Sequence, residues 1–423
     1  MPKQERTSLA HNIRWNNING IFSTLSQNML APFTGIFAIK LGAPDSLIAA
    51  LSSWPALVSL LTMIPGARYV DRYPRQKRLV AALMFFNRIF FFLLALLPFL
   101  VTDPNRRPIV FVAMIALMNV PGSLAVIAWQ SFMGKVIPAT ERGRAFAKRN
   151  QLMSLCGIVA SLLAGRIMDK LVFPTGFQIM FFTGFILAML EIAAFTQVIE
   201  PKGTHATAAP TEASKSVFNW ASMQAGFHRH RNYWLFAGAS LLFHLGWQMG
   251  WPLYTKYQVQ ILGATTTWVS VFGVCQSLSA VAAYPIWAKL ADRYSNQRML
   301  AVATLGMALT PLLYVFCTEL WMLAMLSLLI GVSVAGTVLL LFNTLLELSP
   351  EASRTQYIAY HNTATNATAV VAPYAGILLS SLTGIRWALV CTAIARTIGA
   401  AALALVYRLG QKHVAKTSDA CNF

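Results

Sequence analysis

Twelve apolar stretches, each near the roughly 20 residues that a helix needs to cross a bilayer, are the feature that most limits how this chain can fold. The chain is 57% hydrophobic and 11% charged, whereas a soluble domain carries about a quarter of charged residues. Such a chain cannot cover itself with polar surface, so its solvent is lipid. The sequence therefore predicts an all-α membrane protein. The stretches lie at 15–39, 45–69, 78–101, 108–136, 145–168, 175–199, 233–259, 265–289, 298–317, 320–346, 355–382 and 386–407.

The connections are short except for residues 200–232, a basic stretch rich in Ala, Thr, Pro and Ser. We interpret it as a linker between a six-helix bundle at 1–199 and a second at 233–423. With the N-terminus in the cytoplasm, 24 Lys and Arg lie on the cytoplasmic side and 7 on the other. This excess predicts that both termini and the linker are cytoplasmic, in a multi-pass protein of the plasma (inner) membrane.

Two short motifs recur in both halves. Residues 67–79 read "ARYVDRYPRQKRL" and residues 288–300 read "AKLADRYSNQRML", with six of thirteen positions identical at an offset of 221. Residues 138–150 and 350–362 share Pro, Arg, Ala and Asn at an offset of 212. Two matches in the same order, at matching positions between spans, indicate duplication of a six-helix unit.

The two six-helix halves, the cytoplasmic linker and the Asp-Arg motif after the second and eighth spans resemble the major facilitator superfamily over essentially the whole chain. The motif departs from the family pattern at Ala67 and Ala288, where the family prefers Gly. The resemblance implies two bundles that rock about a central cavity lined by helices 1, 4, 7 and 10. It implies a secondary active transporter and not an enzyme.

The helical period aligns polar residues on one stripe in each of the spans expected to line that cavity. The candidate substrate-binding residues are Ser23, Gln27, Asn119, Gln130, His244, Trp247, Gln248, Trp251 and Thr337. The alternative is that these side chains bond their own backbone or a neighbouring helix. No acidic residue lies deep in these four spans, so a multiply cationic substrate is disfavoured, and neutral or weakly charged, partly aromatic solutes suit the amides and indoles.

The expected function is transport of a small organic solute by alternating access, with proton-coupled efflux through His244, His361 or Glu191 as one possible form. A lipid or amphiphile flippase and a non-transporting receptor are the alternatives. We expect a monomer in the lipid bilayer, no nucleic acid and no cofactor. The five cysteines show no paired spacing, so we expect neither a disulfide framework nor a metal site.

Three charged sets complete the predictions. Arg88 and Glu191, both deep in apolar spans, are expected to form a structural ion pair, with a proton-coupling Glu191 as the alternative. Lys135 and Glu347 are candidates for a cytoplasmic gate. Asp71 and Asp292 are predicted to act as a latch, in which each carboxylate meets the N-terminus of an interface helix of the opposite bundle. The other latch residues are Arg72, Arg293, Arg142 and Arg354.

Overall fold

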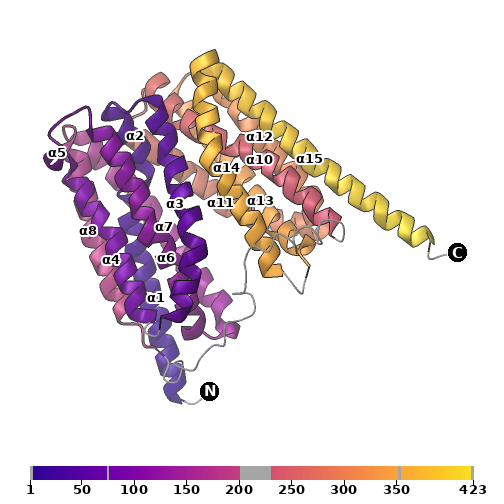
Figure 1. Ribbon diagram of the computed structural model, residues 1–423, viewed down its shortest axis with the longest axis horizontal. Helices are drawn as coiled ribbons and strands as arrows, with labels where there is room; N and C mark the ends of the chain where they lie inside the picture. Colours follow the sequence, from indigo (N-terminus) through magenta and orange to yellow (C-terminus); the bar gives the residue numbers. More distant parts are fainter. Residues whose placement is uncertain (1–2, 74–75, 201–229, 351–353, 421–423) are drawn as a thin grey trace. The chain divides into compact units, whose positions relative to one another are not determined.

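The computed structural model describes residues 3–73, 76–200, 230–350 and 354–420, without the side chains of 3–7, 63–72, 139–140, 142–144, 147, 354–355 and 410–420 (Figure 1). The linker predicted at 200–232 lies almost wholly outside these ranges. The chain divides into two compact units. Unit 1 comprises Met1–Thr211 and Gly263–Val274, and unit 2 comprises Glu212–Leu262 and Cys275–Phe423. The predicted boundaries at 199 and 233 stay predictions.

Twelve helices of 20 or more residues occupy the described ranges. The first six are α1 (Lys3–Asn28), α3 (Asp45–Arg72), α4 (Gln76–Ala95), α6 (Arg107–Val136), α7 (Ala139–Lys170) and α8 (Thr175–Thr196). The second six are α10 (Arg231–Lys256), α11 (Thr266–Tyr294), α12 (Asn296–Phe316), α13 (Leu320–Leu348), α14 (Arg354–Thr383) and α15 (Ile385–Ala420). Helix α11 contributes its first part to unit 1 and its remainder to unit 2.

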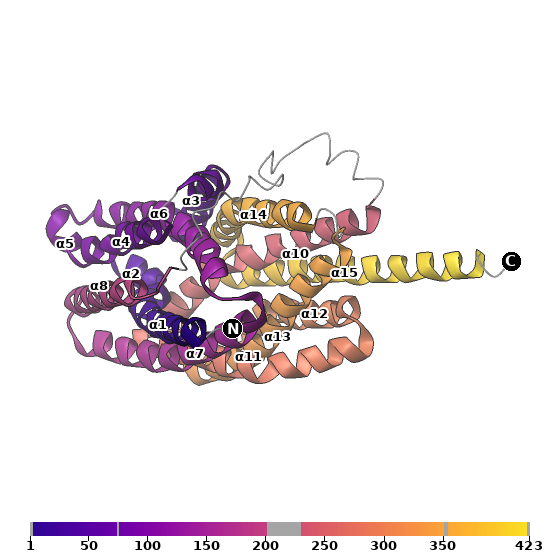
Figure 2. The ribbon, with the colours of Figure 1, turned by 90° about the horizontal axis from the view of Figure 1, so that it is seen from below.

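The two units repeat one packing pattern. In unit 1, α1 packs on α7 and α8, and α4 packs on α6 and α8. In unit 2, α10 packs on α14 and α15, and α12 packs on α13 and α15; Figure 2 shows α10 beside α14 and α15. The first, third, fourth, fifth and sixth long helices of each half thus share these four pairings, which supports the duplication inferred from the short motifs.

Ten of the twelve long helices in the described ranges are long and apolar enough to cross a membrane. The two that do not qualify are α1 and α10, each of 26 residues and therefore long enough. Their polar residues, not their lengths, set them apart. These are the first helices of the two repeats, so the same departure from apolar composition occurs at the same place in both halves.

Several helices differ from the apolar stretches that predicted them. The stretch 15–39 divides into α1, a 3-10 turn η1 (Ala31–Phe33) and α2 (Thr34–Lys40). The stretch 78–101 divides into α4 and α5 (Leu97–Leu100). Prolines at the start of η1 and of α5 lack the N–H that would continue the preceding helix, which explains both interruptions. The last stretch, predicted to end at 407, continues as α15 to Ala420, and a π-helical segment, η3 (Tyr257–Ile261), follows α10.

Candidate functional site

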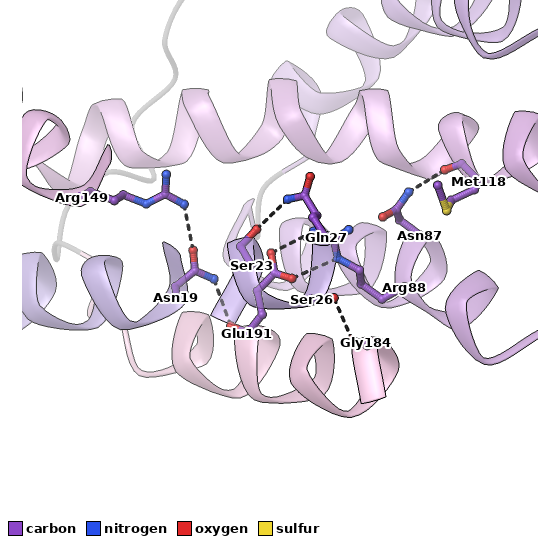
Figure 3. A network of polar contacts seen from close by, with 10 residues as sticks. All are labelled: Asn19, Ser23, Ser26, Gln27, Asn87, Arg88, Met118, Arg149, Gly184 and Glu191. Atoms are coloured by element: carbon purple, nitrogen blue, oxygen red, sulfur yellow. Dashed lines mark hydrogen bonds and ion pairs between the residues drawn. The ribbon is translucent and has the colours of Figure 1, made fainter. Parts of the chain in front are cut away.

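The buried carboxylate of unit 1 belongs to Glu191 on α8, and Arg88 on α4 binds it with two hydrogen bonds (Figure 3). The Nε–Oε2 distance is 3.0 Å and the Nη2–Oε1 distance is 3.2 Å. The side chains are 12% and 2% exposed, so both charges are withdrawn from solvent. The structure thus brings together the two residues that were expected to pair. That the pair is structural stays a prediction.

Asn19 on α1 joins this pair to a second cation. Its Nδ2 donates to the backbone carbonyl of Glu191 at 3.0 Å, and its Oδ1 accepts from Nη2 of Arg149 at 3.4 Å (Figure 3). Ser26, also on α1, donates to the carbonyl of Gly184 at 2.7 Å. Helix α1 therefore binds α8 through polar side chains at two positions along its length. Such contacts are expected between membrane helices, because the hydrophobic effect does not drive their association within lipid.

The four cavity candidates of unit 1 have different environments. Ser23 is buried and accepts from Nε2 of Gln27 at 3.0 Å, while Gln27 itself is exposed. Asn119 donates to the carbonyl of Ile115, one turn earlier in its own helix, at 2.8 Å. This is the self-bonding alternative that the sequence left open for this residue. Gln130 is exposed at the end of its predicted stripe.

Arg149 on α7 is a residue that sequence reasoning missed, because it was counted among the cations of a cytoplasmic loop. Helix α7 begins at Ala139, so Arg149 is already more than two turns inside it. Its guanidinium lies over the ring of Trp129 at 4.7 Å, and its Nε donates to the carbonyl of Asn16 at 3.3 Å. A Cβ on Gly20 would lie 2.8 Å from the same Nε. A glycine in the polar stripe of α1 was the available signal for a large side chain packed against it.

The polar stripe of α10 faces α14 in unit 2. The hydroxyl of Ser240 lies 2.9 Å from Nε2 of His361 and 3.3 Å from Nδ1 of His244. Nδ1 of His244 also lies 2.8 Å from the carbonyl of Ser240. A carbonyl only accepts, so this nitrogen carries the proton. His361 is 7% exposed, and its Nδ1 has no partner and is buried.

One turn further along α10, Gln248 binds α14 through both ends of its amide. Its Oε1 accepts from Thr368 at 2.7 Å, and its Nε2 donates to the carbonyl of Thr365 at 3.2 Å. The predicted stripe of His244 and Gln248 therefore faces one partner helix. Trp247, the candidate between them, is partly buried against the core of unit 2.

The other two cavity candidates of unit 2 lie at the extremes of burial. Trp251 is 40% exposed, whereas Thr337 on α13 is fully buried and its hydroxyl has no hydrogen-bond partner. Thr337 is therefore enclosed by packing in this structure. Both residues were predicted to line the cavity, but their environments differ.

Arg396 on α15 is the most deeply buried cation of unit 2, with 1% exposure. Its Nε donates to the carbonyl of Gly246, and its Nη2 to that of Trp247, both on α10. Its Nη1 donates to the carbonyl of Met307 and to the hydroxyl of Thr310, both on α12. The sequence placed Arg396 within a span, and four neutral oxygens surround it there.

The predicted latch and gate are only partly within the described residues. The side chains of Asp71, Arg72, Arg142 and Arg354 lie outside them. Asp292 is exposed, and the guanidinium of Arg293 lies 5.2 Å from the ring of its neighbour Tyr294. Lys135 is exposed, and Glu347 accepts from Nδ2 of Asn296 at 3.2 Å. The latch and the gate stay predictions.

The contact that was predicted for the latch, a carboxylate on a helix N-terminus, is formed inside unit 1 by another residue. Asp169, near the end of α7, accepts from the backbone N–H groups of Thr266 and Thr267 at 3.0 and 2.7 Å. These are the first two residues of α11, where free N–H groups favour an anion. The expected chemistry therefore occurs here, at Asp169, a position to which the repeated motif gave no clue.

The chain matches the family model of the major facilitator superfamily over residues 17–249 and 236–420. Among solved structures it is similar to the nucleoside transporter NupG, in two crystal structures of which one is of a mutant. The mutant gives a TM-score of 0.73 at 11% identity, covering 93% of this chain and 100% of that one. The other gives 0.71 at 11% identity, with 93% and 98% covered.

It is also similar to a bacterial homolog of the human lysosomal transporter Spinster in an inward-facing, unoccupied conformation, with a TM-score of 0.67, 12% identity, and 96% and 98% of the two chains covered. No curated protein sequence matches the chain. The structural likenesses establish the fold, and the family match covers most of both halves. The chain therefore belongs to the major facilitator superfamily, as a multi-pass membrane protein that is a secondary transporter and not an enzyme.

Proposed function

We propose that the protein transports a small organic solute, neutral or weakly charged and partly aromatic, by alternating access, and that this transport is coupled to protons. The observation that carries the proposal is the polarity of α1 and α10. These two helices alone among the twelve long helices described are too polar to count as candidate spans. Polar residues inside a membrane are costly and mark substrate and ion sites.

The charge of the solute is limited by the buried acids. Glu191 is the only acidic side chain that is buried among the described residues, and Arg88 binds both of its oxygens. A multiply cationic solute would lose its hydration without finding a free carboxylate. Indole and amide groups such as Trp247 and Gln248 suit a solute that combines an aromatic ring with hydrogen-bonding atoms.

The histidine pair of unit 2 supports proton coupling. The rings of His244 and His361 have centroids 5.9 Å apart, and Ser240 lies within hydrogen-bonding distance of both. An imidazole can take up a proton, and protonating His361 would change the donor pattern between α10 and α14. A charged group that contacts α10 close to His244 in sequence is Arg396 of α15, which binds the carbonyls of Gly246 and Trp247.

The orientation is part of the same proposal. The excess of Lys and Arg on one side of the predicted spans leads us to place both termini in the cytoplasm. Cysteine accessibility at the exposed Lys135 and at the exposed Arg106, predicted to face opposite sides, would test this topology.

The test of the function begins with a thermal-shift screen of the purified protein against metabolites and drugs. A hit is then offered to proteoliposomes with and without an imposed pH gradient. We expect accumulation that requires the gradient, that an uncoupler abolishes, and that His361→Gln reduces to the level reached without a gradient. Accumulation that is unaffected by the uncoupler would refute proton coupling. Equilibration of lipid probes without any solute transport would support a flippase instead.

A further inference from the structure

Arg149 carries a charge that forms no direct ion pair with a described residue. The ion pairs formed by described residues are Arg88 with Glu191 and Arg106 with Asp103, and Arg149 belongs to neither. Its two hydrogen bonds, to the carbonyl of Asn16 and to Oδ1 of Asn19, are long, at 3.3 and 3.4 Å, and both acceptors are neutral. Among the described residues, Nη1 of Arg149 has no hydrogen-bond partner.

Asn16 is buried against this cation with its amide unused. It is 1% exposed, and neither its Nδ2 nor its Oδ1 has a hydrogen-bond partner. It lies one turn before Gly20, on the same face of α1, and Nε of Arg149 packs on both residues. Buried polar groups are almost always paired, so an amide with four vacant positions indicates that a partner is missing.

Trp129 supplies a third unused donor beside the same guanidinium. Its indole Nε1 is buried without a partner, and its ring lies 4.7 Å below the guanidinium carbon of Arg149. The ring of Phe146 packs edge-on against it at 5.8 Å. Three helices, α7, α6 and α1, thus contribute a cation, an unpaired indole N–H and an unpaired amide to one cluster with aromatic surface.

We propose that Arg149, Asn16 and Trp129 bind the oxyanion of the transported solute, a carboxylate or a phosphate, and that the solute is a small aromatic anion. The proposal rests on the proposed function and specifies that the weak charge of the solute is negative. An oxyanion accepts several hydrogen bonds at once, and a guanidinium is the group best matched to it. The ring of the solute would lie against Trp129 and Phe146, and Oδ1 of Asn16 would accept from a hydroxyl or amide of the same solute.

A purely structural role for Arg149 makes a different prediction for Asn16. If the cluster serves only to pack α1 on α7, replacing an unpartnered buried amide by Leu removes a cost and nothing else. If the cluster binds a solute, Asn16→Leu keeps or raises the melting temperature while it weakens binding. This separation of stability from affinity does not depend on Arg149 variants folding.

The experiment measures binding of three probes to the purified protein in detergent: benzoate, phenyl phosphate and the uncharged benzamide. We expect at least one anion to bind and benzamide to bind less tightly. Arg149→Gln and Asn16→Leu should weaken that anion by roughly 10- to 100-fold, the range for losing a hydrogen bond to a charged group. Trp129→Phe, which keeps a ring but removes the N–H, should weaken it less. Lys148→Gln, an exposed neighbour on α7, should leave the affinity unchanged.

The proposal is overturned if neither anion binds, if benzamide binds as tightly as the anions, or if Asn16→Leu and Arg149→Gln leave the anion affinity unchanged. Proteoliposome uptake of the same probes separates this from the proposed function. An anion that binds at these residues but is not taken up would refute transport of that solute class and keep the site. A neutral probe that is taken up while the anions are ignored would keep the transporter and refute the site.

Discussion

The same helix seam buries a guanidinium in both units, but the two cations are satisfied in different ways. Where α4 meets α8 in unit 1, Arg88 faces the carboxylate of Glu191. Where α15 meets α12 and α10 in unit 2, Arg396 faces three backbone carbonyls and the hydroxyl of Thr310. A charge withdrawn from water can be stabilised by a counter-ion or by dipoles. Unit 1 stabilises its buried cation with a counter-ion, and unit 2 stabilises its buried cation with dipoles.

Proline explains why one of the three carbonyls that bind Arg396 is available. Pro311 has no N–H, so the carbonyl of Met307, four residues earlier, has lost its helical donor. Nη1 of Arg396 donates to that carbonyl at 3.1 Å. The cation therefore replaces a backbone hydrogen bond that the sequence of α12 had removed.

Glycines bring the helices close enough for this arrangement. A Cβ on Gly246 would lie 2.8 Å from the backbone N of Arg396, and one on Gly250 would lie 2.8 Å from its Nη2. In unit 1, a Cβ on Gly184 of α8 would lie 3.1 Å from its nearest neighbours, Met29 and Phe91. Unit 2 thus combines close helix approach with dipoles, whereas unit 1 combines a looser seam with an ion pair.

The largest effect is expected for Arg396→Met. It removes the four hydrogen bonds that Arg396 donates to oxygens of α10 and α12, and at about 1 kcal/mol for each the loss of stability is about 4 kcal/mol. Thermal and denaturant unfolding of the purified protein in detergent would measure it. Arg408→Met, an exposed cation of the same helix, is the control and should change stability by less than about 0.5 kcal/mol. Equal stability of the two variants would show that Arg396 is not needed for packing.

The next effect is expected for Arg88→Met, at about 3 kcal/mol. Removing one partner of a buried pair costs about 3–5 kcal/mol, and the lower end applies because the carboxyl left behind can take up a proton. Arg88→Met/Glu191→Met should regain most of the lost stability, since both charges are then absent. No single substitution in the described shell of Arg396 offers such a rescue, because none of its partners is charged. Unfolding of both single variants and the double variant closes the thermodynamic cycle.

If both single variants were to unfold like the unmodified protein but lose the pH dependence of uptake, the ion pair would serve proton coupling and not the fold. The buried cation would then serve transport in unit 1 and stability in unit 2. It would also move the coupling site from the histidines of unit 2 to Glu191 in unit 1.

The pairing of Arg88 with Glu191 followed from the sequence because two opposite charges deep in lipid have few alternatives. The environment of Arg396 did not, because its partners are backbone carbonyls, which every sequence contains. Arg149 was misplaced for a related reason. It lies only five residues into the predicted stretch 145–168, so it was counted with the cytoplasmic cations, whereas α7 begins at Ala139 and Arg149 lies well inside it.

The fold was more predictable than the site. Twelve apolar stretches and two repeated motifs were enough for the superfamily, since the bilayer limits a spanning chain to few architectures. The cavity stripes did not give the environment of each side chain. Asn119 bonds its own helix and Thr337 is enclosed, while His244 and Gln248 bind α14. Helical period gives the direction of a side chain but not which neighbour lies there.

The smallest effect is expected for the loss of a single hydroxyl group beside Arg396. Thr310 accepts from Nη1 of Arg396 at 3.2 Å and also donates to the carbonyl of Met307 at 2.8 Å. Thr304, two turns earlier on α12, is equally buried but bonds only carbonyls of its own helix. Thr310→Val should cost about 1 kcal/mol, because an N–H of a buried cation loses an acceptor, while Thr304→Val should cost less than about 0.5 kcal/mol. Unfolding of the two variants side by side measures the difference. Equal costs would mean that the backbone carbonyls alone satisfy Arg396.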